Sequence, residues 1–278
     1  MYKDWRSYGA LPAIDWEGRG YFAYEGHGDR SGRSGAEAFT TDATYETWLR
    51  ALYSAQGGDF SRVPTLVDLF AGDIDPECMD LCESLLGDAA PSATIDRLAQ
   101  RLDSGSASFE ETLSWCSVLV QRGKIADMRI VAKAYEPVAD IKDAAIIPVQ
   151  LSTCLDPGSA LSNPGLFGPV KQYRAAIEQR CDELAKTCET GQALVFKGEP
   201  VGVRRLAVHV LARLRRPCFP SDFRRRFENA TGIDCSSFYE EGRFKPMQAA
   251  ALITGFLESP QSWRFEDGVR YFFGHRIP

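Results

Sequence analysis

Hydrophobic residues recur at helical spacing through most of the chain. In 92–103, four apolar residues fall at i, i+3, i+4 and i+7, and in 201–216 six residues continue the same pattern over three turns. Such spacing places the apolar side chains on one face of a helix. The pattern therefore predicts a mainly α-helical protein.

Helix start signals recur at a nearly constant interval in the first half of the chain. Asp42, Asp75, Ser108 and Asp140 each precede a segment with helical spacing, at intervals of 33, 33 and 32 residues. Asp and Ser are favoured N-cap residues because their side-chain oxygens accept hydrogen bonds from free backbone N–H groups. Ser108 also begins the sequence SFEE, which has the Ser-x-x-Glu spacing of a capping box.

Apolar positions keep the same interval. Those spaced 33 residues apart are Leu52, Leu85, Val118 and Leu151. The segments 61–71 and 92–103 add a shorter helical pattern between the start signals, so the repeating unit is a helix, a turn and a helix. One such unit cannot bury its apolar face, whereas stacked units can. We therefore predict a HEAT-like α-solenoid of antiparallel helix pairs over 42–155; the alternative is an irregular helical bundle whose spacings coincide.

Glycines stand where the first helix of each unit should end. Gly57, Gly87 and Gly123 follow the three predicted helices. A helix C-terminus favours glycine because the residue that ends it often adopts a left-handed conformation. The glycines therefore predict the turn inside each unit.

Three further segments differ from the array in composition. Residues 1–41 are rich in aromatic residues and contain the glycine-rich stretch 26–35, which predicts an irregular segment. Residues 156–168 are dense in Pro, Gly, Ser and Asn and predict a linker. Residues 169–278 predict a C-terminal helical region.

The last residues of the chain predict a small β-hairpin. Apolar and polar residues alternate on both sides of Asp267–Gly268, from Trp263 to Phe265 and from Val269 to Phe273. Asp-Gly between two alternating segments is a strong hairpin signal. This hairpin would cover the last helical layer, as the terminal cap of a repeat array does.

The composition is that of an ordinary globular protein, with 44% hydrophobic and 25% charged residues. The net charge of −6 and the pI of about 5.3 disfavour a dedicated nucleic-acid binder, which needs a basic surface. The first residues do not have the pattern of a signal peptide, and no apolar stretch is long enough to span a bilayer. We predict a cytoplasmic protein that does not interact with membranes.

Eight cysteines are scattered along the chain without a CxxC pair. Disulfide frameworks belong to short secreted domains, so scattered thiols in a longer chain favour a reducing compartment. Cys78 and Cys82 share a helix face by their spacing, but no nearby His or second Cys pair completes a zinc site. We predict free thiols and no structural metal.

No catalytic motif is recognisable. The three histidines are His27, His209 and His275, and the chain has no His-Glu-x-x-His or Gly-x-Ser-x-Gly sequence. A nucleophile and a base that are distant in sequence can still meet in a fold, so an enzyme remains an alternative. We predict a protein with no catalytic residues and no cofactor.

Acidic residues crowd the segment 68–88, which contains no Lys or Arg. Three interpretations are open. The acidic residues form a solvated helix face, or they provide paired carboxylates for acid–base chemistry. Alternatively, they bind a cationic partner protein, and the complementary charge accelerates its association. The residues that we assign to partner binding are Asp68, Asp73, Glu77, Asp80, Glu83 and Asp88.

The segment 201–226 is basic, with eight arginines and one aspartate. Arginine binds carboxylate and phosphate groups through two parallel N–H donors. The segment is a solvated helix face, a source of ion pairs within the chain or with an acidic partner, or a nucleic-acid site. The second choice for partner binding is Arg204, Arg205, Arg213, Arg216 and Arg224.

Three stretches carry a family resemblance: GDFSRVPTLVDLF (58–70), DPECMDLCESLLGDA (75–89) and GVRYFFGHRIP (268–278). They resemble the predicted immunity proteins of bacterial polymorphic-toxin and contact-dependent inhibition systems. The resemblance implies a cytoplasmic protein that binds and neutralises a cognate toxin domain, for example a cationic nuclease, and it carries over no catalytic residues. A general α-solenoid scaffold or adaptor is the main alternative. An RNA-binding protein or an enzyme that uses 204–226 is less favoured.

Overall fold

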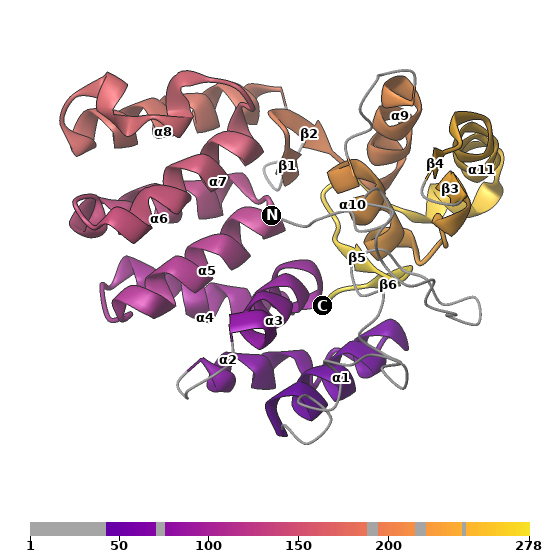
Figure 1. The fold of residues 1–278 in the computed structure, drawn as a ribbon, viewed down its shortest axis with the longest axis horizontal. Coiled ribbons are helices and arrows are strands. Elements are labelled where there is room, and N and C mark those ends of the chain that lie inside the picture. Colours follow the sequence, from indigo (N-terminus) through magenta and orange to yellow (C-terminus); the bar gives the residue numbers. More distant parts are fainter. Residues whose placement is uncertain (1–42, 71–75, 188–193, 215–220, 241–242) are drawn as a thin grey trace. The chain divides into compact units, whose positions relative to one another are not determined.

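The computed structural model describes residues 43–70, 76–187, 194–214, 221–240 and 243–278. These residues form mainly α-helices, with 3₁₀ turns and three antiparallel pairs of short strands (Figure 1). The mainly helical class predicted from the apolar spacing is therefore confirmed. No helix of the described residues is long and apolar enough to cross a membrane. The predicted irregular segment 1–41 lies outside the described residues.

The chain divides into two compact units. Of the described residues, unit 1 joins those of 43–59 with those of 202–277, and unit 2 contains those of 60–201 together with Pro278. This division departs from the predicted domains in two ways. Helix α1 (Ala43–Gln56) belongs to unit 1 although it begins the 33-residue series, and the helices of unit 2 continue beyond the predicted array end at 155.

The six longest helices described in unit 2 alternate between two rows. The first row consists of α3 (Pro76–Ala89), α5 (Phe109–Arg122) and α7 (Ile146–Leu155). The second row consists of α4 (Ser92–Asp103), α6 (Ile125–Tyr135) and α8 (Val170–Lys186). In the first row α3 packs on α5 and α5 on α7; in the second row α4 packs on α6 and α6 on α8 (Figure 1). Within each row, each helix therefore packs on the helix that comes two positions later among these six.

Short elements complete unit 2. They are η2 (Val63–Thr65), α2 (Leu66–Leu69), η3 (Glu136–Val138), η4 (Lys142–Ala145), η5 (Ala160–Ser162), η6 (Pro164–Phe167), and the paired strands β1 (Leu194–Phe196) and β2 (Glu199–Val201). The predicted linker 156–168 contains η5 and η6, which pack on α7 and α8. Its Leu161 is buried, so this segment is a packed part of unit 2.

Three helices begin where the N-cap signals predicted them. α1, α3 and α5 start directly after Asp42, Asp75 and Ser108. The fourth start, after Asp140, begins as the 3₁₀ turn η4 and becomes α-helical only with α7. Pro148 explains this delay, because a proline inside an α-helix clashes with the carbonyl four residues earlier, whereas the first turn tolerates it. Counted from the first residues of α1, α3, α5 and η4, each interval is 33 residues.

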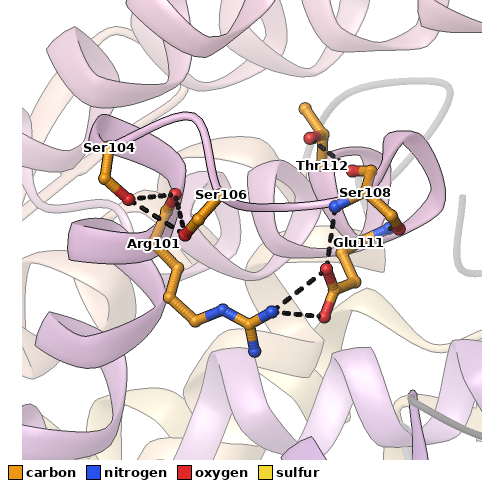
Figure 2. A network of polar contacts seen from close by, with 6 residues as sticks. All are labelled: Arg101, Ser104, Ser106, Ser108, Glu111 and Thr112. Carbon is orange, nitrogen blue, oxygen red and sulfur yellow. Dashed lines mark hydrogen bonds and ion pairs between the residues drawn. The ribbon is translucent and has the colours of Figure 1, made fainter.

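Ser108 closes the N-terminus of α5 with a complete capping box (Figure 2). Its Oγ accepts the backbone N–H of Glu111 (3.2 Å), and the Glu111 carboxylate accepts the backbone N–H of Ser108 (2.8 Å). The same carboxylate accepts two hydrogen bonds from Arg101 of α4, at 2.9 and 3.2 Å. The Arg101 guanidinium also lies 4.5 Å from the centre of the Trp115 ring. The capping box therefore fixes the end of α4 against α5.

We expect Ser108→Ala to lower the free energy of unfolding by about 1 kcal/mol, because the N–H of Glu111 loses its acceptor. Ser92→Ala is the matched control: Ser92 is exposed at the start of α4, where the N-cap is Pro91 and makes no side-chain hydrogen bond. Chemical denaturation measures both variants. Equal losses would show that the capping hydrogen bond contributes nothing.

The apolar positions of the 33-residue series lie in the cores of the two units. The buried members are Leu52 in unit 1 and Leu85, Val118 and Leu151 in unit 2. Gly87 was predicted to end α3, but it lies inside this helix. A Cβ at this position would stand 2.7 Å from Cδ of Gln121 on α5. The glycine therefore permits the close approach of α3 and α5.

Unit 1 combines α1 with the C-terminal elements. The helical ones are α9 (Val203–Arg213), α10 (Ser221–Thr231), η7 (Ser236–Phe238), α11 (Pro246–Glu258) and η8 (Pro260–Arg264). The strand pairs are β3 (Tyr239–Glu240) with β4 (Arg243–Phe244), and β5 (Tyr271–Phe272) with β6 (His275–Arg276). α9 packs on α10 and α11, and β5 packs on α10. Phe256 joins these layers, because its ring centre lies 5.0 Å from that of Phe227 and 5.9 Å from that of Phe265.

The predicted C-terminal hairpin is present, but its turn lies elsewhere. β5 and β6 are joined by Phe273 and Gly274, and not at Asp267–Gly268. Both turn residues have positive φ, 50° and 80°, as in the type I′ turn whose twist suits a hairpin. Their N–H groups donate to carbonyl oxygens near the end of α10. The predicted first strand around Trp263 is wrong, because this residue lies in η8.

Candidate partner-binding surfaces

The structure places the predicted acidic residues on different elements. Asp68 is exposed on α2. Asp73 lies outside the described residues, and so does the side chain of Glu77. The remaining three residues of the predicted site, Asp80, Glu83 and Asp88, all belong to α3.

The carboxylates of α3 have different surroundings. Asp80 is exposed, whereas Glu83 and Asp88 are half-buried. The Nε2 group of Gln121 on α5 donates to Oδ1 of Asp88 and to the carbonyl oxygen of Ser84, both at 3.0 Å. Asp88 is therefore engaged in holding α5 against α3.

Glu83 lies among uncharged polar groups. The hydroxyls of Ser114 and Ser117 on α5 hydrogen-bond its carboxyl, but burial has the larger effect and raises its pKa. Burial also raises the pKa of Asp80. No ion pair joins either carboxylate to a Lys or Arg in the part of the chain that the structure describes. Both carboxylates are thus held where their charge is disfavoured.

Apolar side chains are exposed on α7, the next helix of the row. Ile146 is 47% exposed and Val149 is 42% exposed, one turn further along. On α5, between α3 and α7 in the row, Ser117 and Gln121 are partly exposed. We call these side chains together the first-row face: Asp80, Glu83, Ser117, Gln121, Ile146 and Val149. The apolar part could not be predicted, because a short apolar stretch does not reveal which of its side chains reach the surface.

The second row carries its charges as ion pairs between neighbouring elements. Lys133 of α6 binds Asp103 at the end of α4, and Arg129 of α6 binds Asp182 of α8, both at 2.6 Å. A further pair joins α8 to η3. Exposed pairs of this kind contribute little to stability, but they neutralise the charges of this row. The carboxylates of the first-row face have no such compensation among the described residues.

The predicted basic residues, like the predicted acidic ones, have different surroundings. Arg224 of α10 is fully buried and pairs with Glu228 at 3.0 Å, so it belongs to the core of unit 1 and not to a surface. Arg213 is half-buried and its Nη1 lies 3.1 Å from Nδ1 of His209. Arg216 lies outside the described residues. The other two arginines of the predicted set are at the start of α9.

The six described cysteines are buried and have free thiols. Burial raises the pKa of Cys82, Cys116 and Cys181 to about 12, so the reactive thiolate is scarce at neutral pH. Cys188 and Cys218 lie outside the described residues. Across the described ranges, no group of three or more His, Cys, Asp or Glu side chains is placed to hold a metal ion.

Comparison of the chain with protein-family models, with curated proteins and with solved structures finds no match. A fold by itself does not identify a function, because the same fold serves many.

Proposed function

We propose that the protein works without catalysis, by binding a partner protein through the first-row face. The observation that carries this proposal is the position of Glu83. Its carboxyl is partly removed from water, and no ion pair joins it to a Lys or Arg of the described residues. Such a position costs stability in the free protein. A Lys or Arg side chain of a partner would offset this cost in the complex.

The apolar residues of the same face define the rest of the partner surface. Ile146 and Val149 would bury apolar area on contact, at about 25 cal/mol for each Å² removed from water. Protein interfaces commonly combine such an apolar centre with a polar rim. The partner therefore presents a basic side chain beside an apolar patch.

The same proposal takes unit 2 to be a HEAT-like α-solenoid. Two observations support it. Within each row, each helix packs on the next, and the starts of α3, α5 and η4 in the first row are 33 residues apart. Stacked helices present a rigid surface, and a rigid surface loses little conformational entropy on binding. This architecture suits a protein that must hold a partner tightly.

A toxin domain is the partner class that the family resemblance favours, and the protein would then be a cytoplasmic antidote. A general scaffold or adaptor is the alternative. Co-expression with the product of the neighbouring gene distinguishes them. An antidote forms a complex with that product and restores growth of cells that express it. A neighbouring product that is harmless or is not bound would contradict the antidote function.

We expect Glu83→Gln to raise the midpoint of thermal unfolding of the free protein at neutral pH. The raised pKa means that the folded state binds more protons than the unfolded state above the ordinary glutamate value of about 4.3. The stability of the wild-type protein therefore falls as the pH rises through this range. The neutral variant avoids that loss, so its advantage should disappear in acid, where both states of the wild type are protonated.

Glu183→Gln is the control for this measurement. Glu183 is exposed on α8, in the second row, and pairs with Arg180 at 3.2 Å. Its replacement should not stabilise the protein at any pH. If Glu83→Gln lowers the midpoint at neutral pH, the carboxylate of Glu83 is already stabilised within the free protein, and the argument for a missing cation is wrong.

A further inference from the structure

An arginine and a tryptophan form a stacked pair on the surface of unit 1. The guanidinium of Arg204 at the start of α9 lies 3.8 Å from the centre of the Trp263 ring. Trp263 nevertheless remains 72% exposed. Tryptophan usually buries most of its large apolar surface, so the open face of Trp263 leaves an unusually large apolar area available for contact.

The pair is held in place by buried hydrogen bonds. Arg204 donates to the Oγ of Ser262, which is fully buried, and to the carbonyl of Leu257 at 3.5 Å. Ser262 in turn donates to the Ser259 carbonyl at 2.8 Å. The Trp263 side chain therefore stands on a turn whose geometry is fixed before any partner arrives, and such preorganisation lowers the entropic cost of binding.

The neighbouring positions of α9 extend the surface. Val208 lies one turn after Arg204 and is 54% exposed, and Arg205 is exposed beside them. The helix α9 contains three arginines and no Asp or Glu. Among the described residues, no ion pair joins Arg204 or Arg205 to a carboxylate. We call Arg204, Arg205, Val208 and Trp263 the Trp263 surface.

We propose that the Trp263 surface is a second docking site, which binds an acidic segment of a partner protein that also carries an apolar side chain. The open face of Trp263 and the side chain of Val208 would pack on the apolar residue. The guanidinium groups of Arg204 and Arg205 would bind the carboxylates beside it, because arginine recognises carboxylate through parallel N–H donors. Trp and Arg are also the residue types that most often dominate the binding energy of protein interfaces.

The observations favour a protein segment over nucleic acid. A single-stranded polynucleotide needs a basic groove with several aromatic platforms along it. The Trp263 surface offers one aromatic ring, already stacked on an arginine, and the net charge of the chain is −6. This site has the opposite charge to the first-row face, so it goes beyond the proposed function and does not depend on it.

The test uses the full-length protein and a synthetic probe. The probe is a ten-residue peptide that alternates Asp-Glu with Leu-Phe. NMR follows the indole N–H signal of Trp263, assigned by its loss in Trp263→Phe, and calorimetry measures the peptide affinity of the wild type and of each variant. We expect the peptide to shift this signal in a saturable way. Trp263→Ala should weaken binding by about tenfold or more, and a peptide with Asn-Gln in place of Asp-Glu should also bind more weakly.

Two controls make the outcomes decisive. Leu166→Ala removes another exposed apolar side chain, in η6 of unit 2, and should leave peptide affinity unchanged. Because Trp263 is exposed, Trp263→Ala should keep the wild-type melting curve. A loss of binding would then come from the changed docking site and not from unfolding. The proposal is overturned if the acidic peptide does not bind, if it binds Trp263→Ala as tightly as the wild type, or if an oligouridine RNA binds more tightly than the peptide.

Discussion

Glu228→Ala is expected to destabilise the protein by about 3–5 kcal/mol, which is the usual cost of removing one member of a buried ion pair. Glu228 and Arg224 have side chains that are 0% exposed and lie 3.0 Å apart. The same Oε1 of Glu228 accepts the backbone N–H of Cys235 at 2.8 Å. The variant therefore removes a buried carboxylate that pairs with the Arg224 guanidinium and accepts the N–H of Cys235. Chemical denaturation measures the loss.

The exposed pair of Glu46 and Arg50 provides the control. It lies in the same unit and has the same four-residue spacing, but its side chains are about three-fifths exposed. Solvent screens such a pair, so Glu46→Ala should change the stability by no more than about 0.5 kcal/mol. Similar losses in the two variants would show that burial of the Arg224 pair does not determine its contribution.

Gly123→Ala is expected to cost about 2–4 kcal/mol, because it combines backbone strain with a steric clash. Gly123 ends α5 in the left-handed conformation, with a φ of 76°. A Cβ there would stand 2.5 Å from the carbonyl oxygen of Val195 in β1. The Gly123 carbonyl also accepts the N–H of Val195 at 2.6 Å. The methyl group would therefore push β1 away from the end of α5.

Gly105→Ala separates the two causes of this loss. Gly105 also has a positive φ, 68°, but a Cβ there would meet no atom within 4 Å. It should cost only the strain of the left-handed conformation, about 1–2 kcal/mol. Equal losses at the two glycines would show that the contact with β1 does not contribute. Hydrogen exchange at the Val195 amide should increase in Gly123→Ala alone.

The helical part of the fold could be predicted because its signals are local. Ser108 marks a helix start through a hydrogen bond from Glu111 in the next turn, and Gly123 ends a helix through its own left-handed conformation. The placement of α1 could not be predicted in this way, since the 33-residue interval does not say which unit its apolar face packs on. The role of Gly87 could not be predicted either, because a glycine that ends a helix and one that permits the close approach of a neighbouring helix look alike in sequence.

The candidate sites were predicted less well, because charge density in a sequence does not reveal burial. Arg224 belongs to a basic cluster in the sequence but is a core residue that pairs with Glu228. Glu83 belongs to an acidic cluster, yet it differs from an ordinary surface carboxylate because burial raises its pKa. Trp263 was assigned to a strand by alternation, and its stacking on Arg204 joins two residues that are distant in sequence.

The central claim is that the first-row face binds a partner protein, and the affinity for the product of the neighbouring gene tests it most directly. Calorimetry would compare the wild-type protein with the double variant Asp80→Lys and Glu83→Lys, and with Glu183→Lys on the second row, after circular dichroism has shown that each is folded. We expect the double variant to bind at least about 30-fold more weakly, equivalent to 2 kcal/mol, because repulsion replaces attraction at this face. Glu183→Lys should bind like the wild type. A double variant with wild-type affinity would contradict the claim.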